Sequence, residues 1–339
     1  MTDEAIRSPS SLRFPRAVVT GGCGFLGSHI CDALIGAGVE VLALDNFSTG
    51  TLDNVSHLLD DPRFSLRETD VTCGIDVPEH VDLVLHLASP ASPRDYTRLP
   101  LETLAAGAAG THAALRLALR DRARFVLAST SEVYGDPLQH PQSETYWGHV
   151  NPVGPRAAYD EAKRYAEALT ICFARTYGLN TSIVRIFNTY GPRLQWNDGR
   201  VVPNLIGQAL LDEPLTLYGD GTQTRSLCYV SDTVRGILAL AASRFGGPVN
   251  IGSTEEVTVH SLALRIRELV GSHSALRFLP PLPDDPCRRR PDISLARREL
   301  RWRPRVSLGS GLRATIAAFR AAGTGSSESQ PRSQAANPS

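Results

Sequence analysis

Residues 16–27 read RAVVTGGCGFLG, a short apolar run followed by a glycine-rich loop. The apolar run predicts a β-strand, and residues 28–36 after the loop predict a helix. Gly21 allows a tight turn, Gly24 lets the backbone approach a diphosphate, and Gly27 lets the helix pack on the strand. This order of strand, loop and helix predicts a dinucleotide-binding α/β fold, with the diphosphate at the helix N-terminus.

The next βα units refine the prediction of the cofactor. Residues 40–44 form an apolar strand that ends at Asp45. A carboxylate there can accept both ribose hydroxyls of NAD and repel the 2′-phosphate of NADP, so it favours NAD(H). Asp70 stands where a third strand would end, and it either contacts adenine or caps a loop. His86 lies in the apolar run 81–89, and we expect a core histidine rather than a catalyst.

The stretch around Tyr159 is the first indication of chemistry. Lysine and arginine together number 35, and Lys163 is the single lysine among them. Tyr159 and Lys163 are four residues apart, so a helix would place them on one face. An ammonium beside a phenol lowers the pKa of the phenol, which predicts a general base for a sugar or alcohol hydroxyl. The spacing alone is more typical of an ordinary pair on a helix surface.

Composition and charge argue against several other classes of protein. The formal net charge is zero, which argues against a nucleic-acid or membrane-surface partner. No apolar run approaches the length of a membrane span, and residues 1–16 contain no signal-peptide core. The six cysteines show no metal-binding spacing and resemble scattered free thiols. We therefore expect a cytoplasmic protein with no metal site.

The pattern of elements predicts four segments along the chain. The regular βα alternation fades after the strand that ends near residue 187, and the last residues are rich in Gly, Ser and Gln. The predicted segments are a flexible arm (1–14), a mainly NAD-binding domain (15–187), a mainly substrate-binding lobe interleaved with the last elements of the sheet (188–320), and a disordered tail (322–339).

Longer strings of residues resemble a known family. The order Thr20-Gly21-x-x-Gly24-x-x-Gly27, Asp45, Thr130 and Tyr159-x-x-x-Lys163 resembles the extended short-chain dehydrogenase/reductase superfamily, which includes NAD-dependent sugar-nucleotide epimerases and dehydratases. Four further strings are similar to the UDP-glucuronate decarboxylase family, and they are HLASPASP (86–93), STSEVYGDP (129–137), YWGHVNP (146–152) and NDGRVV (197–202).

This resemblance implies a Rossmann doubly wound parallel sheet with a smaller C-terminal substrate-binding lobe. It implies catalytic roles for Thr130, Ser131, Glu132, Tyr159 and Lys163. It implies contacts to NAD from Gly21, Gly24, Phe25, Leu26, Gly27, Asp45, Asn46, Ser48, Thr49, Gly50, Asp70, Val71, Leu87, Ser89, Tyr159 and Lys163. It implies contacts to the UDP-sugar from Asn188, Arg200, Val201, Tyr218, Arg225 and Arg289. Family members are commonly homodimers, which implies a four-helix bundle built from the helices near 101–120 and 159–177.

Decarboxylation agrees with the residues after Thr130. In the related dehydratases the matching threonine is followed by Asp-Glu, whereas Ser131 and Glu132 follow it here. The loss of the acid removes the proton donor for dehydration, but a C6 carboxylate β to a C4 ketone leaves without one. The implied route runs from UDP-glucuronate through a UDP-4-keto-hexuronate to UDP-xylose. Tyr159, its pKa lowered by Lys163 and the nicotinamide charge, would deprotonate O4, Thr130 would hold it, and Ser131 and Glu132 would position the sugar or a proton-donating water.

One segment departs from the family pattern. Residues 105–107 read Ala-Ala-Gly where the decarboxylases usually read Lys-Thr-Asn. A cation near the sugar carboxylate and an amide in the proton path are therefore missing. We draw the hypothesis that part of the intermediate leaves as UDP-4-keto-pentose together with NADH.

Two other functions remain open from the sequence. A 4-epimerase acting on a UDP-hexuronate or UDP-hexose shares the oxidation at C4 but keeps C6. A non-catalytic NAD-binding scaffold is the alternative from another class, and the intact Thr130, Tyr159 and Lys163 argue against it.

Overall fold

Seven parallel strands form the central sheet of the protein, in the order β11-β6-β5-β4-β1-β2-β3. The computed structural model describes residues 13–196, 198–281 and 288–325. The strand order reverses direction between β1 and β4, which is where ligands bind in doubly wound sheets. The predicted Rossmann fold is confirmed, with strands β1 Arg16–Thr20, β2 Glu40–Asp45, β3 Phe64–Glu68, β4 Leu83–His86, β5 Arg124–Thr130, β6 Thr181–Ile186 and β11 Pro248–Ile251.

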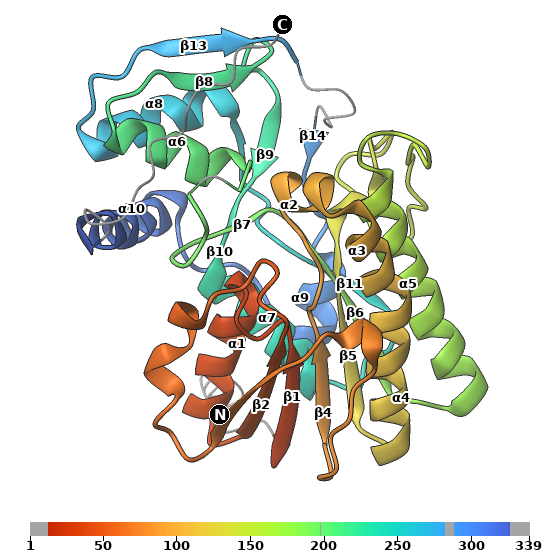
Figure 1. Ribbon diagram of the computed structural model, residues 1–339. Helices are drawn as coiled ribbons and strands as arrows, with labels where there is room; N and C mark the ends of the chain where they lie inside the picture. Colours follow the sequence, from red (N-terminus) through yellow and green to blue (C-terminus); the bar gives the residue numbers. More distant parts are fainter. Residues whose placement is uncertain (1–12, 197, 282–287, 326–339) are drawn as a thin grey trace, which may run out of the picture.

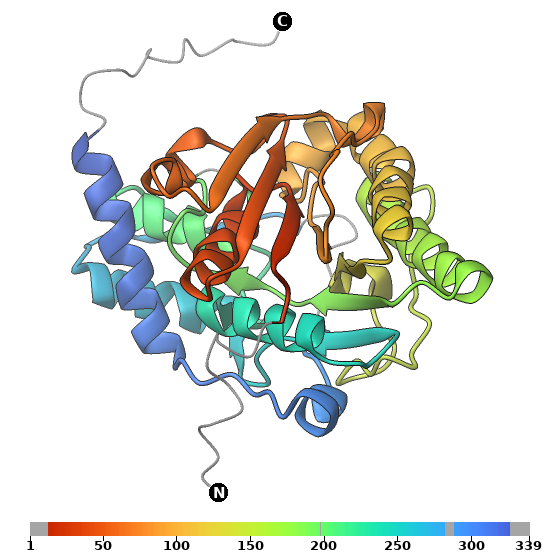
Figure 2. The same ribbon diagram turned by 90° about the horizontal axis from the view of Figure 1, so that it is seen from below.

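Helices cover both faces of this sheet (Figures 1 and 2). Apolar side chains of α1, α7 and α9 share one buried cluster with one face of the sheet, and those of α4 and α5 share another with the opposite face. The bounds of these helices and of the short helices near them are α1 Phe25–Gly36, η2 Leu52–Asn54, η3 Ser56–Leu58, η4 Val71–Cys73, α2 Pro93–Arg98, α3 Pro100–Ala105, α4 Thr111–Asp121, η6 Ser131–Tyr134, α5 Ala157–Tyr177, α7 Val230–Ala242 and α9 Ser294–Leu300.

The glycine loop between β1 and α1 explains the first βα unit. Gly21 has a φ of 70°, the left-handed conformation that side chains disfavour, so the chain turns sharply there. A Cβ at Gly27 would overlap the carbonyl oxygen of Gly21. Helix α1 can therefore pack this closely on the loop only without a side chain at that position, as the sequence predicts.

A second lobe lies over the carboxyl ends of the strands (Figure 1). Its own apolar core joins α6, α8 and α10 with β8, and Leu205, Leu262 and Phe319 are buried in it. Between these elements the chain returns to the sheet through α7 and β11, so the two lobes are interleaved. The elements here are β7 Thr189–Tyr190, α6 Val201–Leu210, β8 Leu215–Tyr218, β9 Thr224–Ser226, β10 Cys228–Tyr229, β12 Glu256–Thr258, α8 Val259–Val270, β13 Leu276–Leu279, β14 Arg288–Arg289 and α10 Leu308–Gly325.

The helix predicted near 101–120 is not one regular α-helix. A π-helical turn at Ala106–Gly110 separates α3 from α4. A Cβ at Gly107 would lie 2.7 Å from both the Cβ and the carbonyl oxygen of Ala162 in α5. The turn therefore lies where the backbone approaches α5 more closely than a side chain would allow. The prediction of an unbroken helix is wrong here because periodicity does not report such a local widening.

The two ends of the chain were predicted to be irregular. Residues 1–12 of the predicted arm and 326–339 of the predicted tail lie outside the described residues. Helix α10 continues to Gly325, so residues 322–325 are helical rather than part of a tail. Local composition did not reveal that this helix continues past 321. Within the described part of the chain, no helix is both long enough and apolar enough to cross a membrane.

Candidate active site

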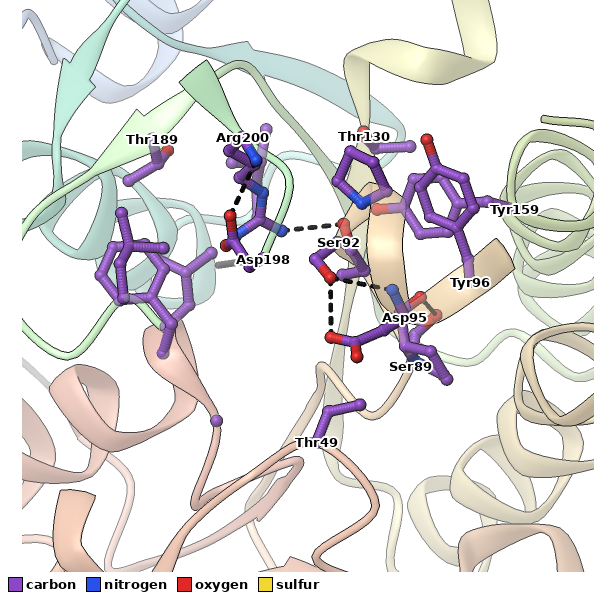
Figure 3. Close-up of a pocket in the computed structure, with 18 of the residues that line it drawn as sticks. Thr49, Ser89, Ser92, Asp95, Tyr96, Thr130, Tyr159, Thr189, Asp198 and Arg200 are labelled. Carbon is purple, nitrogen blue, oxygen red and sulfur yellow. Dashed lines mark hydrogen bonds and ion pairs between the residues drawn. The ribbon is translucent and has the colours of Figure 1, made fainter. Parts of the chain in front are cut away.

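A cavity of about 520 Å³ lies between the carboxyl ends of the strands and the second lobe. It brings together the five predicted catalytic residues, the six predicted sugar-nucleotide residues and all but one of the predicted cofactor residues. Gly50 is the exception, and it lies beside the cavity, against the carboxylate of Asp45. Figure 3 shows Tyr159 and Thr130 in this cavity, with Arg200 and Asp198 opposite them.

The half of the cavity next to β1 and β2 fits a dinucleotide. Gly24 is the N-cap residue of α1, and no side chain caps the first turn of that helix. Phe25 and Leu26 follow it at the cavity wall, so free backbone N–H groups and the positive end of the helix are available to a diphosphate. These residues therefore fit the diphosphate of the predicted cofactor.

Asp45 lies at the end of β2 and is held by the glycine loop. Its carboxylate accepts backbone N–H bonds from Cys23 and Phe47, each 2.9 Å long. Burial raises the pKa of Asp45 above its usual value, and these backbone hydrogen bonds oppose the rise. The side chain is therefore oriented by the backbone, and since Asp45 lines the cavity its carboxylate can accept hydrogen bonds from ribose hydroxyls.

Tyr159, Lys163 and Thr130 form the predicted catalytic group. Tyr159 and Lys163 lie one turn apart on α5, and the Lys163 ammonium is 5.9 Å from the centre of the Tyr159 ring. The Lys163 Nζ donates to the carbonyl oxygen of Ala128 at 2.9 Å. Thr130, at the end of β5, lines the same cavity as Tyr159. A substrate hydroxyl beside Tyr159 can therefore contact the phenol and the threonine together.

The pKa values of this group differ in part from the sequence prediction. Burial raises the pKa of Tyr159 to about 12, while the nearby hydroxyl of Thr130 and the charge of Arg200 act against the rise. The predicted lowering of this pKa is wrong for the chain by itself, because burial disfavours the phenolate more than its neighbours stabilise it. Burial also lowers the pKa of Lys163 to about 8, although Glu167 opposes this. Bound NAD⁺ adds a positive charge, which acts to lower the pKa of the phenol.

Glu132 is held between two arginines at the edge of the same group. Arg156 pairs with its Oε2 and Arg289 pairs with its Oε1, although Arg289 is far away in the sequence. Burial acts to raise the pKa of Glu132, but Arg289 and Arg156 together outweigh it and lower this pKa. Glu132 is therefore ionised at neutral pH and is suited to positioning groups rather than to donating a proton. Ser131 is buried next to it.

The predicted sugar-nucleotide residues line the side of the cavity formed by the second lobe. Arg200 donates to Asp198 at 3.0 Å and to the carbonyl oxygen of Ala91 at 2.8 Å (Figure 3). Arg225 is buried and donates to the carbonyl oxygen of Thr224 at 2.9 Å. Asn188, Val201 and Tyr218 lie along the same wall. This wall therefore offers guanidinium groups, which suit a diphosphate.

Two side chains beside the catalytic group were missed in the sequence. Arg156 precedes α5 and, besides contacting Glu132, lies 5.9 Å from the centre of the Tyr96 ring. Tyr96 stacks on Tyr159, with ring centres 5.0 Å apart and planes 13° apart (Figure 3). The position of Arg156, three residues before Tyr159, was an available signal. Nothing local indicates that α2 brings Tyr96 against Tyr159.

Two other predictions from the sequence concern Asp70 and His86. Asp70 caps η4 by accepting from the backbone N–H and the hydroxyl of Thr72, and it also lines the cavity. His86 is buried and hydrogen-bonded to Thr20 at 2.8 Å and to Thr111 at 3.2 Å. Burial lowers the pKa of His86 to about 3, so it is a neutral core histidine, as predicted. No group of possible metal ligands occurs among residues 13–196, 198–281 and 288–325.

Comparisons with known proteins agree with this geometry. Residues 17–252 match the profile of the NAD dependent epimerase/dehydratase family. The chain is 50% identical over 305 residues to UDP-glucuronic acid decarboxylase 1 of Arabidopsis thaliana, covering 90% of this chain and 70% of that protein. It is 50% identical over 304 residues to the protein of the same name in Danio rerio, and the match covers 90% of this chain and 72% of that protein.

Solved structures include a UDP-glucuronic acid 4-epimerase from Bacillus cereus in complex with UDP-glucuronic acid and NAD. Its sequence is 29% identical to this chain, and its TM-score is 0.82. The match covers 91% of this chain and 99% of that one. The same arrangement of lobes thus occurs in a protein that holds both a UDP-sugar and NAD.

Proposed function

The chain belongs to the NAD dependent epimerase/dehydratase family, and from this premise we propose that it decarboxylates UDP-glucuronate to UDP-xylose with NAD as its cofactor. The chain is an enzyme. Its sequence is 50% identical to the two decarboxylases and 29% identical to the 4-epimerase. The observation that carries the proposal is the position of Glu132. Two arginines, Arg156 and Arg289, pair with this one carboxylate at the cavity wall, and such a site suits a sugar that carries a carboxylate.

The residues of the chain take the following roles in this proposal. Tyr159 accepts the proton of the C4 hydroxyl, and Thr130 in the same cavity holds O4 by a hydrogen bond. NAD⁺ held by the glycine loop and Asp45 would supply the hydride acceptor for C4 and would give the hydride back, so it would not be consumed. Once C4 is a ketone, the bond between C5 and C6 breaks, its electron pair moves to O4, and carbon dioxide leaves. Tyr159 and Thr130 stabilise the resulting charge on O4, and a proton then reaches C5.

Ser131 and Glu132 orient the ring or the water that delivers the C5 proton. The low pKa of Glu132 supports this positioning role, since an ionised carboxylate has no proton to give. Arg200, Arg225 and their neighbours on the second lobe bind the nucleotide diphosphate. The glycine loop and Asp45 bind the cofactor.

Product analysis tests the proposed function directly. The purified protein is incubated with UDP-glucuronate and NAD⁺, nucleotide products are followed by mass, and NADH is followed by absorbance. Loss of the mass of one carbon dioxide to give UDP-xylose is the expected result. Conversion to another UDP-hexuronate of unchanged mass would instead establish a 4-epimerase and overturn the proposal.

We also propose that two copies of the chain associate through α4 and α5, which lie side by side on the outside of the molecule (Figures 1 and 2). Leu101 and Leu104 at the start of this helical layer are 75% and 41% exposed, and Tyr165 on α5 is 53% exposed. Two such faces would form a four-helix bundle and cover these side chains. A dimer by light scattering that Tyr165→Glu converts to a monomer is the expected result.

A cytoplasmic location remains a further proposal. The free thiols of Cys23, Cys31, Cys73, Cys172 and Cys228 support it, since reduced cysteines are typical of reducing compartments. Fractionation of the cells that make the protein tests it.

A further inference from the structure

Asp160 is a buried acidic side chain to which the mechanism above assigns no role. It follows Tyr159 on α5, and only 5% of its surface is exposed. Its Oδ1 is buried and has no hydrogen-bond partner in the structure. An ionised carboxylate in such a place is unfavourable unless it is paired, because it has lost water without replacement.

The positive charges near Asp160 form their ion pairs with Glu132. Arg156 lies one turn before Asp160, so the two side chains leave the same face of α5, and the Asp160 N–H donates to the Arg156 carbonyl oxygen at 3.1 Å. The guanidinium of Arg156, however, pairs with Glu132, as does that of Arg289 on β14. Two arginines thus pair with the carboxylate of Glu132, and the carboxylate of Asp160 has no ion pair.

The groups facing Asp160 act on it in opposite directions. Burial and the charge of Glu132 raise the pKa of Asp160 to about 7, and Glu161 adds to the rise, while Arg156 and Arg289 act to lower it. Tyr96 on α2 also faces this group, and its phenol is neutral because burial raises its pKa. Near neutral pH, Glu132 is therefore ionised, while Asp160 is protonated in part of the molecules.

The protonation of Asp160 sets the charge of the whole cluster. With Asp160 neutral, Glu132 and the two arginines sum to one positive charge, and with Asp160 ionised the sum is zero. Glu132, Arg156 and Arg289 line the cavity, whereas Asp160 does not. Asp160 can therefore influence a bound substrate only through these three side chains.

We propose that Asp160 is a positioning residue that couples binding of the carboxylate-bearing sugar to uptake of one proton. The inference rests on the proposed function, in which the sugar brings its own carboxylate to this cluster. A new negative charge beside the cluster favours protonated Asp160, and by linkage protonated Asp160 favours the bound sugar. Replacement of the C5–carboxylate bond by a C5–H bond also consumes one proton in each turnover. The proton held at Asp160 keeps the cluster positive while the substrate carboxylate is present.

Calorimetry on a protein that cannot turn over tests the proposal. The Tyr159→Phe protein is loaded with NAD⁺ and titrated with UDP-glucuronate in buffers of different ionisation enthalpy, which gives the number of protons taken up. We expect uptake that approaches one proton at about pH 8, and an affinity that falls about tenfold per pH unit above the pKa of Asp160. UDP-xylose, which has no carboxylate on its sugar, should show little uptake.

Three variants in the same background separate a charge effect from a structural one. Asp160→Asn keeps the shape of the neutral side chain, so it should bind UDP-glucuronate without proton uptake and with an affinity that pH hardly changes. Asp160→Glu should restore the uptake. Glu161→Gln is the matched control, because Glu161 is the next residue, has the same charge and pairs with Arg164 at 3.5 Å. It should keep the uptake of the parent protein.

Two results would overturn the inference. One is equal proton uptake with UDP-xylose, and the other is unchanged uptake in Asp160→Asn. Carbon dioxide release by the unaltered protein tests the proposed function separately. If the unaltered protein releases carbon dioxide and Asp160→Asn retains the uptake, only the role of Asp160 is wrong.

Discussion

The two helical segments that pack together beside the cavity supply very different side chains. The start of α5 supplies Tyr159 and Lys163, and Arg156 immediately before it adds a guanidinium. The facing segment 105–110 contains only Ala and Gly, and its backbone approaches Ala162 at a distance that excludes a Cβ at Gly107. The start of α5 thus supplies the charged and titratable side chains, while segment 105–110 supplies only small, uncharged ones. Close backbone packing on α5 therefore occupies the position of a side chain at Gly107, whereas Ala105 and Ala106 line the cavity.

The strongest test of the α5 side of this comparison is Tyr159→Phe. Loss of the phenolic oxygen removes the base and one partner of O4, so we expect turnover to fall by about 10² to 10⁴. Binding of NAD should change little, since the glycine loop and Asp45 do not depend on this oxygen. Product formation and NAD titration of the same preparation measure both. Turnover close to that of the unaltered protein would show that another group is the base.

The facing segment is tested by Gly107→Ala. The added Cβ would meet backbone and side-chain atoms of Ala162 at 2.7 Å, so we expect a loss of about 1–3 kcal/mol in the free energy of unfolding. The matched control is Gly36→Ala near the end of α1, where an added Cβ meets no heavy atom within 4 Å. It should be neutral or slightly stabilising. Equal denaturant midpoints for the two variants would contradict the close packing.

The pH dependence of kcat sharpens the role of Lys163. Burial lowers the pKa of this ammonium to about 8, so it is charged below that pH and neutral above it. The reactive form of the pair, the Tyr159 phenolate with the Lys163 ammonium, has lost one proton, so kcat should rise about tenfold per pH unit below about pH 8 and level off above it. Measurement at saturating substrate separates this effect from that of Asp160, which acts on affinity near pH 7. A kcat that does not change between about pH 6 and pH 8 would refute this role of Lys163.

The smallest expected effect comes from Ala105→Lys, which restores a cation to the facing segment. Ala105 is half-buried and lines the cavity, so a lysine there can reach it. If the missing cation allows the keto intermediate to escape, the share of UDP-4-keto-pentose and NADH among the products should fall several-fold. Ala108→Lys, three residues further along the same segment, is the control. Exclusive formation of UDP-xylose by the unaltered protein, without NADH, would end the hypothesis of leakage.

Local pattern was sufficient for the parts of the site that lie within one βα unit or one helix turn. The glycine loop, Asp45 and the pair Tyr159 and Lys163 were identified in this way. Each depends on backbone geometry that repeats with a fixed period, so spacing along the chain translates directly into position. The same reasoning predicted a neutral core position for His86, since a histidine inside a continuous apolar run is surrounded by the core.

The sequence by itself therefore determined the Rossmann sheet, the dinucleotide loop and the residues available for catalysis. Only the tertiary structure decided how these residues are charged. Arg289 reaches Glu132 from 157 positions away, which leaves Asp160 unpaired, and burial raises the pKa of Tyr159 rather than lowering it. The physical reason is that hydrogen-bond periodicity is local, whereas desolvation and Coulomb energies depend on every group that folding brings within a few ångströms.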